Sequence, residues 1–562
     1  MRIALSLAVL APLAHQALAA CEPEITFPPP RLTPDNLAEA FAQVDASIQA
    51  LVAAGVFNAT SFSLEVASPA RTLHSVYHAA QDARQPVNAS AAYRIASNTK
   101  LFTALGILQE EAAGRLSLDD RITKFIPTLR RAAGPIAWDA ITLRTLLAHL
   151  SGIPDNYAEE DLILSLSDPS AVGLPDLSAQ EMARLPTCEG FSNYTEPCTT
   201  EELLGYLQQA SPVFPAKVET SYSNVGYDLL GQVLAKVSNL TYEQYIETAI
   251  LQPLNLTGTA FTPTATSIQV EDSYYGVELG EGNPSAGLYS SAADMIRFLR
   301  FALAQHNNIT PALNWFLPAA YSSGAHSFLG YPWEIFRSPA ILPNSTRSVT
   351  LNTKGGGLTG YYTYSFVVPV YDLVMFMAVA GELTGLNELL DVVIDPILVG
   401  AEAVAQERLA TAYAGTYRAA SNTGLNSSMT IGHSDDKSLF VSAWVSNATD
   451  VMAALVPLVA AQEGSGDNIY FEFLPTFETR TAADGRVGEV WRFINVLGGD
   501  GGDTETRGNA SSIWQDYCVS NIDPLSYGGV GLNEAVFWRA GNATAAVQSL
   551  ELSAFRVVLQ RE

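Results

Sequence analysis

The chain has 562 residues, of which 48% are hydrophobic and 15% are charged, and its formal net charge is −27. This hydrophobic content excludes a disordered chain, and the length predicts about two to four domains. The strong negative charge argues against nucleic-acid or anionic-membrane partners, because both are bound by basic surfaces.

Residues 1–20 have the pattern of a secretory signal peptide. Arg2 lies near the start, an apolar stretch follows, and small residues precede Cys21. The apolar stretch is too short to span a bilayer, so we predict a secreted, extracellular protein without integral membrane association. Eleven Asn-x-Ser/Thr sequons fit the same eukaryotic route. They are Asn58, Asn88, Asn193, Asn239, Asn255, Asn308, Asn344, Asn426, Asn447, Asn509 and Asn542.

The four cysteines are even in number, as expected for a disulfide-bonded secreted protein. Of the three possible pairings we prefer Cys188 with Cys198, which closes a short loop, and Cys21 with Cys518. A zinc site is the alternative, but the spacing lacks a Cys-x-x-Cys pair or a nearby histidine cluster. We predict disulfides, no metal and no cofactor.

The first half of the chain alternates helix and strand signals. Residues 21–34 form an extended, proline-rich leader, and an apolar periodic segment over 36–54 predicts a helix. A strand is predicted at 62–67 and a helix at 101–113, which Gly114 ends.

The middle of the chain contains a long stretch at 153–220 that is rich in Pro, Ser and Thr. Loops of that length in a compact domain usually act as lids or binding loops. Helices are predicted at 226–237 and 242–251, and two adjacent strands, 348–353 and 362–369, flank a glycine cluster.

After about residue 400 the pattern changes. A linker helix at 399–412 leads into short alternating segments separated by turns, which predict an all-β domain at 413–562, in the form of a small barrel. The expected strands are 428–432, 438–445, 470–474, 487–496, 534–538 and 550–559.

Ser97 and Lys100 form the pair with the clearest chemical potential. At the start of a helix, residues three apart lie on one face, so an amine stands beside a hydroxyl. A serine becomes a nucleophile when a neighbour takes its proton, and a lysine can do so when burial lowers its pKa. We expect Ser97 to be the nucleophile and Lys100 its partner.

Two later segments supply the other groups that acyl transfer needs. Tyr222-Ser-Asn224 offers a phenol that can relay a proton and an amide that can hold a substrate carbonyl. Lys354-Gly-Gly356-Gly357 offers a cation followed by glycines, where a strand can let an acyl group come close to its backbone. Together these segments provide a nucleophile, a proton shuttle and an electrostatic stabiliser.

With these motifs, the sequence over about 35–395 resembles the serine β-lactamase and penicillin-binding-protein superfamily, in its class C β-lactamase, D-aminopeptidase and esterase branch. Further matching segments are Gly114–Asp120, Ile141–Gly152 and Ala286–Asp294. The resemblance implies an α+β catalytic domain at 35–398, an antiparallel sheet flanked by helices with an all-helical region beside it. The C-terminal region, entered through Tyr413–Tyr417, resembles the lipocalin-like β domain of some members.

The resemblance also implies roles for the motif residues. Ser97 would be the acylated serine, and Lys100 with Tyr222 the general base and acid. Asn224 would orient the substrate, and Lys354, on an edge strand, would bias the tyrosine toward its ionised form or hold a substrate carboxylate. The backbone N–H groups of Ser97 and Gly357, beside Gly356, would form the oxyanion hole.

Two features qualify the expected activity. Lys354-Gly-Gly356 replaces the Lys-Thr-Gly of β-lactamases, so a hydroxyl that helps hold an antibiotic's carboxylate is missing. His149 lies in a spacer segment and is interpreted as structural rather than as part of a Ser-His-Asp triad.

We therefore expect a secreted serine hydrolase that cleaves an ester, amide or lactone of a small molecule or peptide through an acyl-enzyme on Ser97. The alternatives are an acyltransferase that uses the same intermediate, and a catalytically silent binding glycoprotein. The sequence does not indicate the oligomeric state.

Overall fold

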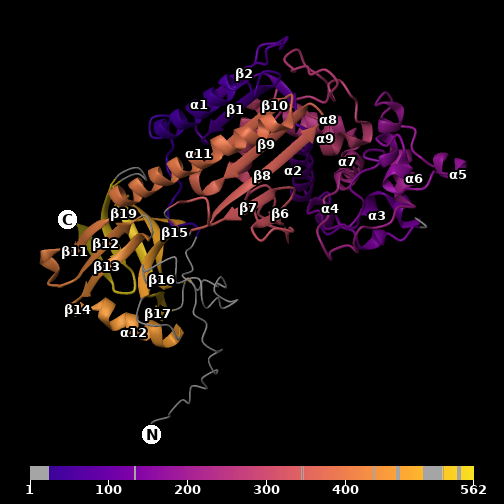
Figure 1. Ribbon diagram of the computed structural model, residues 1–562. Coiled ribbons are helices and arrows are strands. Elements are labelled where there is room, and N and C mark those ends of the chain that lie inside the picture. The colour runs from indigo at the N-terminus through magenta and orange to yellow at the C-terminus, as the bar shows by residue number, and fades with distance from the viewer. Residues whose placement is uncertain are drawn as a thin grey trace, which may run out of the picture. The chain divides into compact units, whose positions relative to one another are not determined.

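The computed structural model describes residues 24–131, 134–343, 345, 347–434, 437–463, 469–497, 522, 525–540 and 546–562 (Figure 1). It has two compact units. The N-terminal unit holds residues 32–338 and 350–397, and the C-terminal unit holds residues 339–349 and 398–562 with the segment up to residue 31. The predicted signal peptide at 1–20, Cys21, Cys518, Asn344, Asn509 and Asn542 lie outside the described residues.

An eight-stranded sheet forms the centre of the N-terminal unit, in the order β2-β1-β10-β9-β8-β7-β6-β5. The neighbouring pairs from β2 to β8 are antiparallel. The strands are β1 (Ser61–Ala67), β2 (Thr72–His78), β5 (Ala320–Tyr321), β6 (Ser327–Leu329), β7 (Glu334–Ser338), β8 (Val349–Leu358), β9 (Tyr361–Val368) and β10 (Leu373–Ala380).

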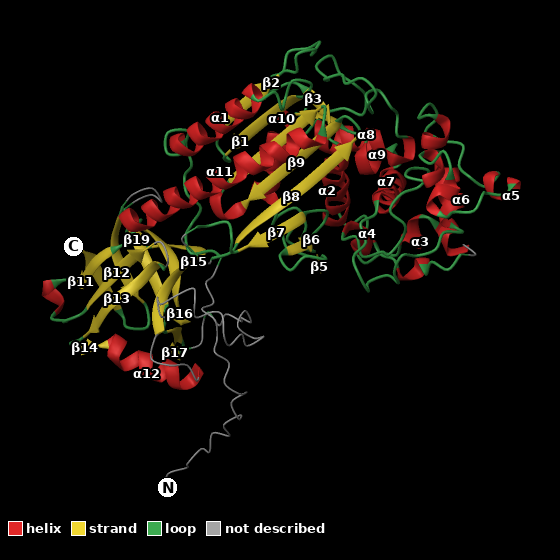
Figure 2. Ribbon diagram, viewed as in Figure 1, coloured by secondary structure: helices red, strands yellow, loops and turns green. Residues whose placement is uncertain are grey.

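Helices cover this sheet because its central strand is apolar on both faces. Every residue of β10 is buried. Side chains alternate between the two faces of a strand, so Val374 and Phe376 enter the main core with residues of α10 (Ala292–Gln305). Figure 2 shows α1 (Ala38–Ala53) and α11 (Leu383–Ala412) running along one face of the sheet.

A mostly helical region follows the first strands, as the fold class predicts (Figure 1). Its central helix α2 (Thr99–Ala112) is buried over most of its length, because apolar residues occupy nearly every side of it. The other helices are α3 (Ile122–Phe125), α4 (Leu143–Leu147), α5 (Ala179–Met182), α6 (Thr200–Leu207), α7 (Asn224–Ser238), α8 (Tyr242–Ile246) and α9 (Asn283–Ala286). A two-stranded ribbon pairs β3 (Ala92–Arg94) with β4 (Tyr289–Ser291).

The C-terminal unit is an antiparallel β-barrel. Eight strands pair with their neighbours in sequence, and the last of them pairs with the first, which closes the sheet. They are β11 (Gly415–Ala419), β12 (Ser428–Ser434), β13 (Ser438–Ser446), β15 (Ile469–Thr481), β16 (Val487–Leu497), β19 (Glu534–Arg539), β20 (Val547–Leu552) and β21 (Val557–Arg561). Short β14 (Thr449–Asp450), β17 (Ser526–Tyr527) and β18 (Val530–Gly531) are additional. The predicted fold class, an antiparallel α+β domain followed by an all-β barrel, is confirmed.

One local expectation was wrong: the segment expected as one strand at 550–559 forms both β20 and β21, because a turn at 553–556 separates them. The helix predicted at 399–412 is present, as the end of the 30-residue α11, which accommodates Pro396 in its interior. The helix α12 (Val451–Glu463) lies in a segment for which the sequence made no prediction.

Candidate active site

Ser97 lies in a short 3-10 turn, Ala96–Asn98, that leads directly into α2. Lys100 is in the first turn of α2, and its Nζ donates a hydrogen bond to Ser97 Oγ over 3.0 Å. Ala96 has a φ of 46°, an uncommon conformation for a residue with a side chain, and such conformations cluster at functional sites. The structure thus brings together the two residues that the spacing paired.

The surroundings of Lys100 lower the pKa of its amine. Its side chain is fully buried, and its Nζ donates to three uncharged oxygens: Ser97 Oγ, Asn224 Oδ1 at 2.5 Å and the Ser285 carbonyl at 2.9 Å. Burial lowers the pKa of Lys100, and the positive charge of Lys354 lowers it further against the opposing effect of Tyr222. Burial also raises the pKa of nearby Asp228 well above its ordinary value.

Tyr222 lies between the two lysines. Lys100 Nζ is 5.1 Å and Lys354 Nζ is 5.3 Å from the centre of its ring. Burial alone would raise the pKa of the phenol, but Lys100, Lys354 and a hydrogen bond with Ser97 hold it below its ordinary value. The lowered pKa makes the phenol of Tyr222 suited to accept a proton from Ser97, with which it shares a hydrogen bond.

His149 supports the tyrosine from behind. Its ring stacks on that of Tyr222 with 4.4 Å between ring centres, and its Nδ1 accepts a hydrogen bond from the Ser223 N–H at 3.1 Å. Burial lowers the pKa of His149 well below its usual range, so the ring is neutral. It contacts the tyrosine rather than the serine, which agrees with its interpretation as structural.

Asn224 is the first residue of α7, and a polar network fixes its side chain. Ser223 caps the helix by accepting a hydrogen bond from the Gly226 N–H at 3.0 Å. The Asn224 amide donates to Asn156 Oδ1 at 2.6 Å and to Asp155 Oδ1 at 3.2 Å, while its oxygen accepts from Lys100. These contacts position Lys100 as well as the amide that the sequence assigned to the substrate.

Strand β8 carries Lys354, Gly356 and Gly357. It is not the edge strand that was expected, because β7, β6 and β5 follow it in the sheet. Gly356 is required sterically. A Cβ there would lie 2.3 Å from the carbonyl oxygen of Ile95, so only glycine lets β8 come this close to the turn that carries Ser97.

A buried amide ties the turn to the sheet. Asn98 donates through Nδ2 to Thr363 Oγ1 at 2.9 Å and accepts through Oδ1 from Ser365 Oγ at 2.7 Å, and both partners lie on β9. Thr363 Oγ1 in turn donates to the Ile95 carbonyl at 3.0 Å. The position of Ser97 relative to the sheet is therefore set by paired polar groups on both sides.

Comparison with known proteins decides the family. The family model described as "Beta-lactamase" matches residues 48–392, and the model described as "Beta-lactamase-like-like, C-terminal domain" matches residues 405–562. The chain belongs to the β-lactamase family.

Relatives of this β-lactamase-family chain extend over both units. The probable hydrolase M10 of Phoma sp. is 32% identical over 557 residues, which cover 96% of this chain and 91% of the relative. The probable hydrolase clz13 of Cochliobolus lunatus is 31% identical and covers 100% of this chain and 94% of its own length. Among solved structures, a class C β-lactamase is 19% identical over 64% of this chain and 96% of its own, with a TM-score of 0.49.

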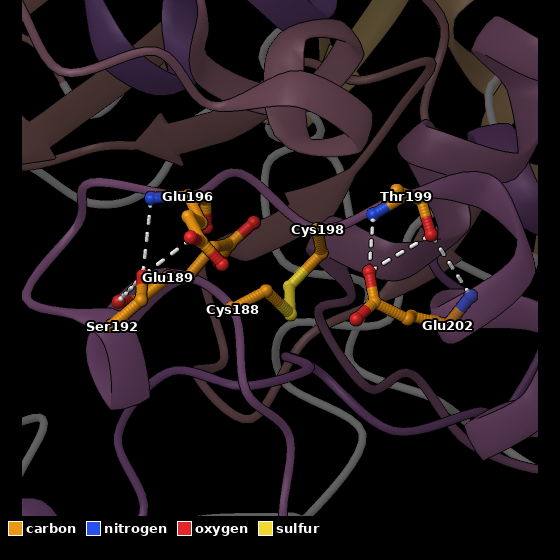
Figure 3. Close-up of a disulfide and its surroundings, with 7 residues drawn as sticks. All are labelled: Cys188, Glu189, Ser192, Glu196, Cys198, Thr199 and Glu202. Atoms are coloured by element: carbon orange, nitrogen blue, oxygen red, sulfur yellow. Dashed lines mark hydrogen bonds between the residues drawn. A yellow bond between two sulfur atoms is a disulfide. The ribbon is translucent and has the colours of Figure 1, made fainter.

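This β-lactamase-family chain carries a disulfide in the long loop at 153–220. Cys188 and Cys198 are bonded, as predicted (Figure 3). Between them, Glu189 is buried, and its pKa is raised to about 8, chiefly by burial and then by the charge of Glu159. Burial likewise raises the pKa of Glu159 to about 7, against the opposing charge of Lys100.

Eight sequons of the chain lie in described residues. All eight of these asparagines are exposed: Asn58, Asn88, Asn193, Asn239, Asn255, Asn308, Asn426 and Asn447. Within the described ranges, no helix combines the length and apolar character needed to cross a membrane. The same residues hold no group of three or more His, Cys, Asp or Glu side chains placed to bind a metal ion.

Sequence reasoning missed Glu334, Ser285, Asn98 and Asp155. Ser285, on α9, accepts a hydrogen bond from Lys100 through its carbonyl, and Asp155, on a loop, accepts one from Asn224. Asn98 lies between Ser97 and Lys100 in the sequence but was assigned no role. Glu334, on β7, accepts a hydrogen bond from Lys354 Nζ at 2.5 Å. One signal was available for Asn98. A polar amide at the start of an apolar helix, between the predicted nucleophile and its lysine, needs hydrogen-bond partners if it is buried.

Proposed function

We propose that the protein is a serine hydrolase that forms an acyl-enzyme on Ser97. The proposal rests on one observation: the two buried lysines beside the Tyr222 phenol, Lys100 and Lys354, have different hydrogen-bond partners. Lys100 contacts Ser97 and has only uncharged hydrogen-bond acceptors, whereas Lys354 has a carboxylate partner. Pairs of titratable groups whose environments push their pKa values apart are typical of acid and base assignments in active sites.

In the acylation step, Ser97 Oγ attacks the substrate carbonyl carbon, and its proton passes to the pair formed by Tyr222 and Lys100. The carbonyl oxygen becomes an oxyanion, for which the backbone N–H groups of Ser97 and Gly357 are the proposed donors. When the tetrahedral intermediate collapses, the bond to the leaving group breaks, and that group takes the proton back from the pair. Loss of one oxyanion donor costs about two to three orders of magnitude in rate in such sites.

In the deacylation step, the same pair takes a proton from water, and the resulting hydroxide attacks the acyl carbon. The bond to Ser97 Oγ then breaks, the serine recovers its proton, and a carboxylic acid leaves. The substrate class that fits this chemistry is an ester, amide or lactone. The names of the curated relatives, both probable hydrolases, support hydrolysis.

We also propose that the protein is secreted. Support comes from the signal-peptide pattern of residues 1–20, the Cys188–Cys198 disulfide and the exposed sequons. Disulfides of this kind persist in oxidising compartments and are rare in the cytosol.

The test of the catalytic proposal is the turnover of matched chromogenic esters, anilides and lactones by the parent protein and by Ser97→Ala. We expect turnover of at least one class, and its reduction by about a thousandfold or more in the variant. If the folded parent protein cleaves none of them, or if Ser97→Ala keeps its activity, the proposal is wrong.

A further inference from the structure

Lys354 is already paired with a carboxylate of its own unit. Its Nζ donates to Glu334 Oε1 at 2.5 Å and to the Gly355 carbonyl at 2.7 Å. The second oxygen of Glu334 accepts a hydrogen bond from the Gly355 N–H at 2.8 Å. Both carboxylate oxygens are thus engaged on the same stretch of β8, so the pair has a defined geometry.

The carboxylate is the member of this pair that solvent reaches. The side chain of Lys354 is 1% exposed and that of Glu334 is 32% exposed. A molecule that approaches β8 from the solvent side therefore meets a negative group before it meets the ammonium. The ammonium keeps its charge: burial would lower the pKa of Lys354, but Glu334 and then Tyr222 raise it above its ordinary value.

Two further carboxyl groups lie near Asn224 and Lys100. Asp155 Oδ1 accepts from the backbone N–H and the side-chain amide of Asn224, and Glu159 is close enough to Lys100 to feel its charge. Lys100 itself is committed to three oxygens of the protein. A substrate carboxylate placed beside Ser97 would therefore have to compete with Glu334 for Lys354.

We infer that Glu334 is a specificity-determining residue: it occupies, as an internal counterion, the place on Lys354 that a substrate carboxylate would otherwise take. This inference rests on the proposed function and specifies its substrate class. The enzyme selects acyl substrates that carry no negative charge near the scissile bond. An anionic substrate must either displace Glu334, which breaks an ion pair and a backbone hydrogen bond, or remain beside a like charge.

The test uses two esters that share an acyl group and differ in one charge: the butyryl ester of 3-hydroxybenzoate and that of methyl 3-hydroxybenzoate. We expect the parent protein to favour the neutral ester by at least about tenfold in kcat/KM at low salt, because like charges repel across the short distance to Glu334. Glu334→Gln should shrink this preference by about tenfold or more, mainly through a lower KM for the anionic ester.

Two variants serve as controls. Glu334→Asp keeps the negative charge and should keep the preference for the neutral ester. Glu39→Gln removes an equal charge from the exposed first turn of α1 and should leave the ratio of the two kcat/KM values unchanged. The parent ratio, which needs no variant, remains a readout if Glu334→Gln fails to fold.

The outcomes separate the two claims. If the parent protein cleaves both esters equally, or if Glu334→Gln slows both by the same factor, Glu334 only holds Lys354 in place and the inference is wrong while the hydrolase proposal stands. If the folded parent protein cleaves neither ester nor any other acyl substrate, the hydrolase proposal fails and the inference falls with it.

Discussion

At the scale of single residues, the site depends on the different environments of side chains of one type. Tyr222 and Tyr227 both lie near Lys100, whose Nζ is 5.1 Å and 5.7 Å from the centres of their rings. The pKa of Tyr222 is lowered by the two lysines, whereas burial raises the pKa of Tyr227 well above its usual range, and its hydroxyl donates to the Leu147 carbonyl at 2.8 Å. Of these two tyrosines, only Tyr222 is suited to accept a proton.

This contrast gives a matched pair of variants. Tyr222→Phe should lower kcat by about two to four orders of magnitude, the usual range for loss of a general acid or base. Tyr227→Phe removes the same atom from the neighbouring ring and should stay within a few-fold of the parent. Steady-state kinetics on one ester decides this, and equal effects of the two changes would reject the proton-relay role of Tyr222.

Glu189, in the disulfide loop of Figure 3, should make the stability of the fold depend on pH. Its pKa is about 8 in the folded protein against 4.5 as its ordinary value. Below pH 4.5 the carboxyl is protonated in both states, so it has no effect. Between pH 4.5 and about 8 only the unfolded chain releases the proton, so stability falls as the pH rises, and above pH 8 the loss is complete.

Glu189→Gln should remove this loss. We expect the variant to be more stable than the parent at pH 8.5, by up to about 5 kcal/mol at roughly 1.4 kcal/mol per pKa unit, and equal to it at pH 4. Thermal unfolding at the two pH values measures the effect, and Glu196→Gln, an exposed carboxylate in the same loop, is the control. A gain that is the same at both pH values would contradict the assigned cause.

At the scale of elements, the approach of β8 to the Ser97 turn sets the width of the site. The packing at Gly356 leaves no room for a methyl group, since a Cβ there would lie 2.3 Å from the Ile95 carbonyl oxygen. At Gly357 the nearest atom to an added Cβ is 3.5 Å away, in the ring of Tyr362, which is an ordinary contact. Gly356 and Gly357, although neighbours on β8, therefore differ in whether their surroundings tolerate an added methyl group.

Gly356→Ala should push β8 away from Ser97 and lower kcat/KM by about a hundredfold, since a displacement of about 1 Å has that cost in active sites. Gly357→Ala keeps its backbone N–H and should remain within about tenfold of the parent. Kinetics on the same ester, with circular dichroism to confirm folding, compares them. If Gly356→Ala is fully active, the close approach of β8 is not needed for catalysis.

The elements also show what the sequence could predict. Helices α2 and α7 and strands β8 and β9 were predictable, because their periodicity is local and their ends carry Gly, Ser or Asn signals. Glu334 was not, because it reaches Lys354 only through the pairing of β7 beside β8, 20 residues apart in sequence. The helix α12 was missed because its apolar run includes Pro457 and resembles the neighbouring strand segments.

At the scale of the whole molecule, three features support the proposal that the protein is secreted. The chain combines a net charge of −27, a disulfide and eight exposed sequons among the described residues. Glycans attach to exposed asparagines, so the location of these sites on the surface is compatible with their use.

Expression in a eukaryotic secretory host should therefore give a protein in the medium whose mass falls when N-glycans are removed by a glycosidase. Mass spectrometry of the released peptides identifies the occupied asparagines, and we expect several of the eight exposed ones. Retention of the protein in the cytosol, with no change of mass on treatment, would contradict secretion.

The most direct test of the central claim is covalent labelling of Ser97 by a fluorophosphonate, read by intact-protein and peptide mass spectrometry. We expect one label per chain, on the peptide that contains Ser97, and none on Ser97→Ala. A label on another serine, or equal labelling of the parent and the variant, would contradict the account of Ser97 as the nucleophile.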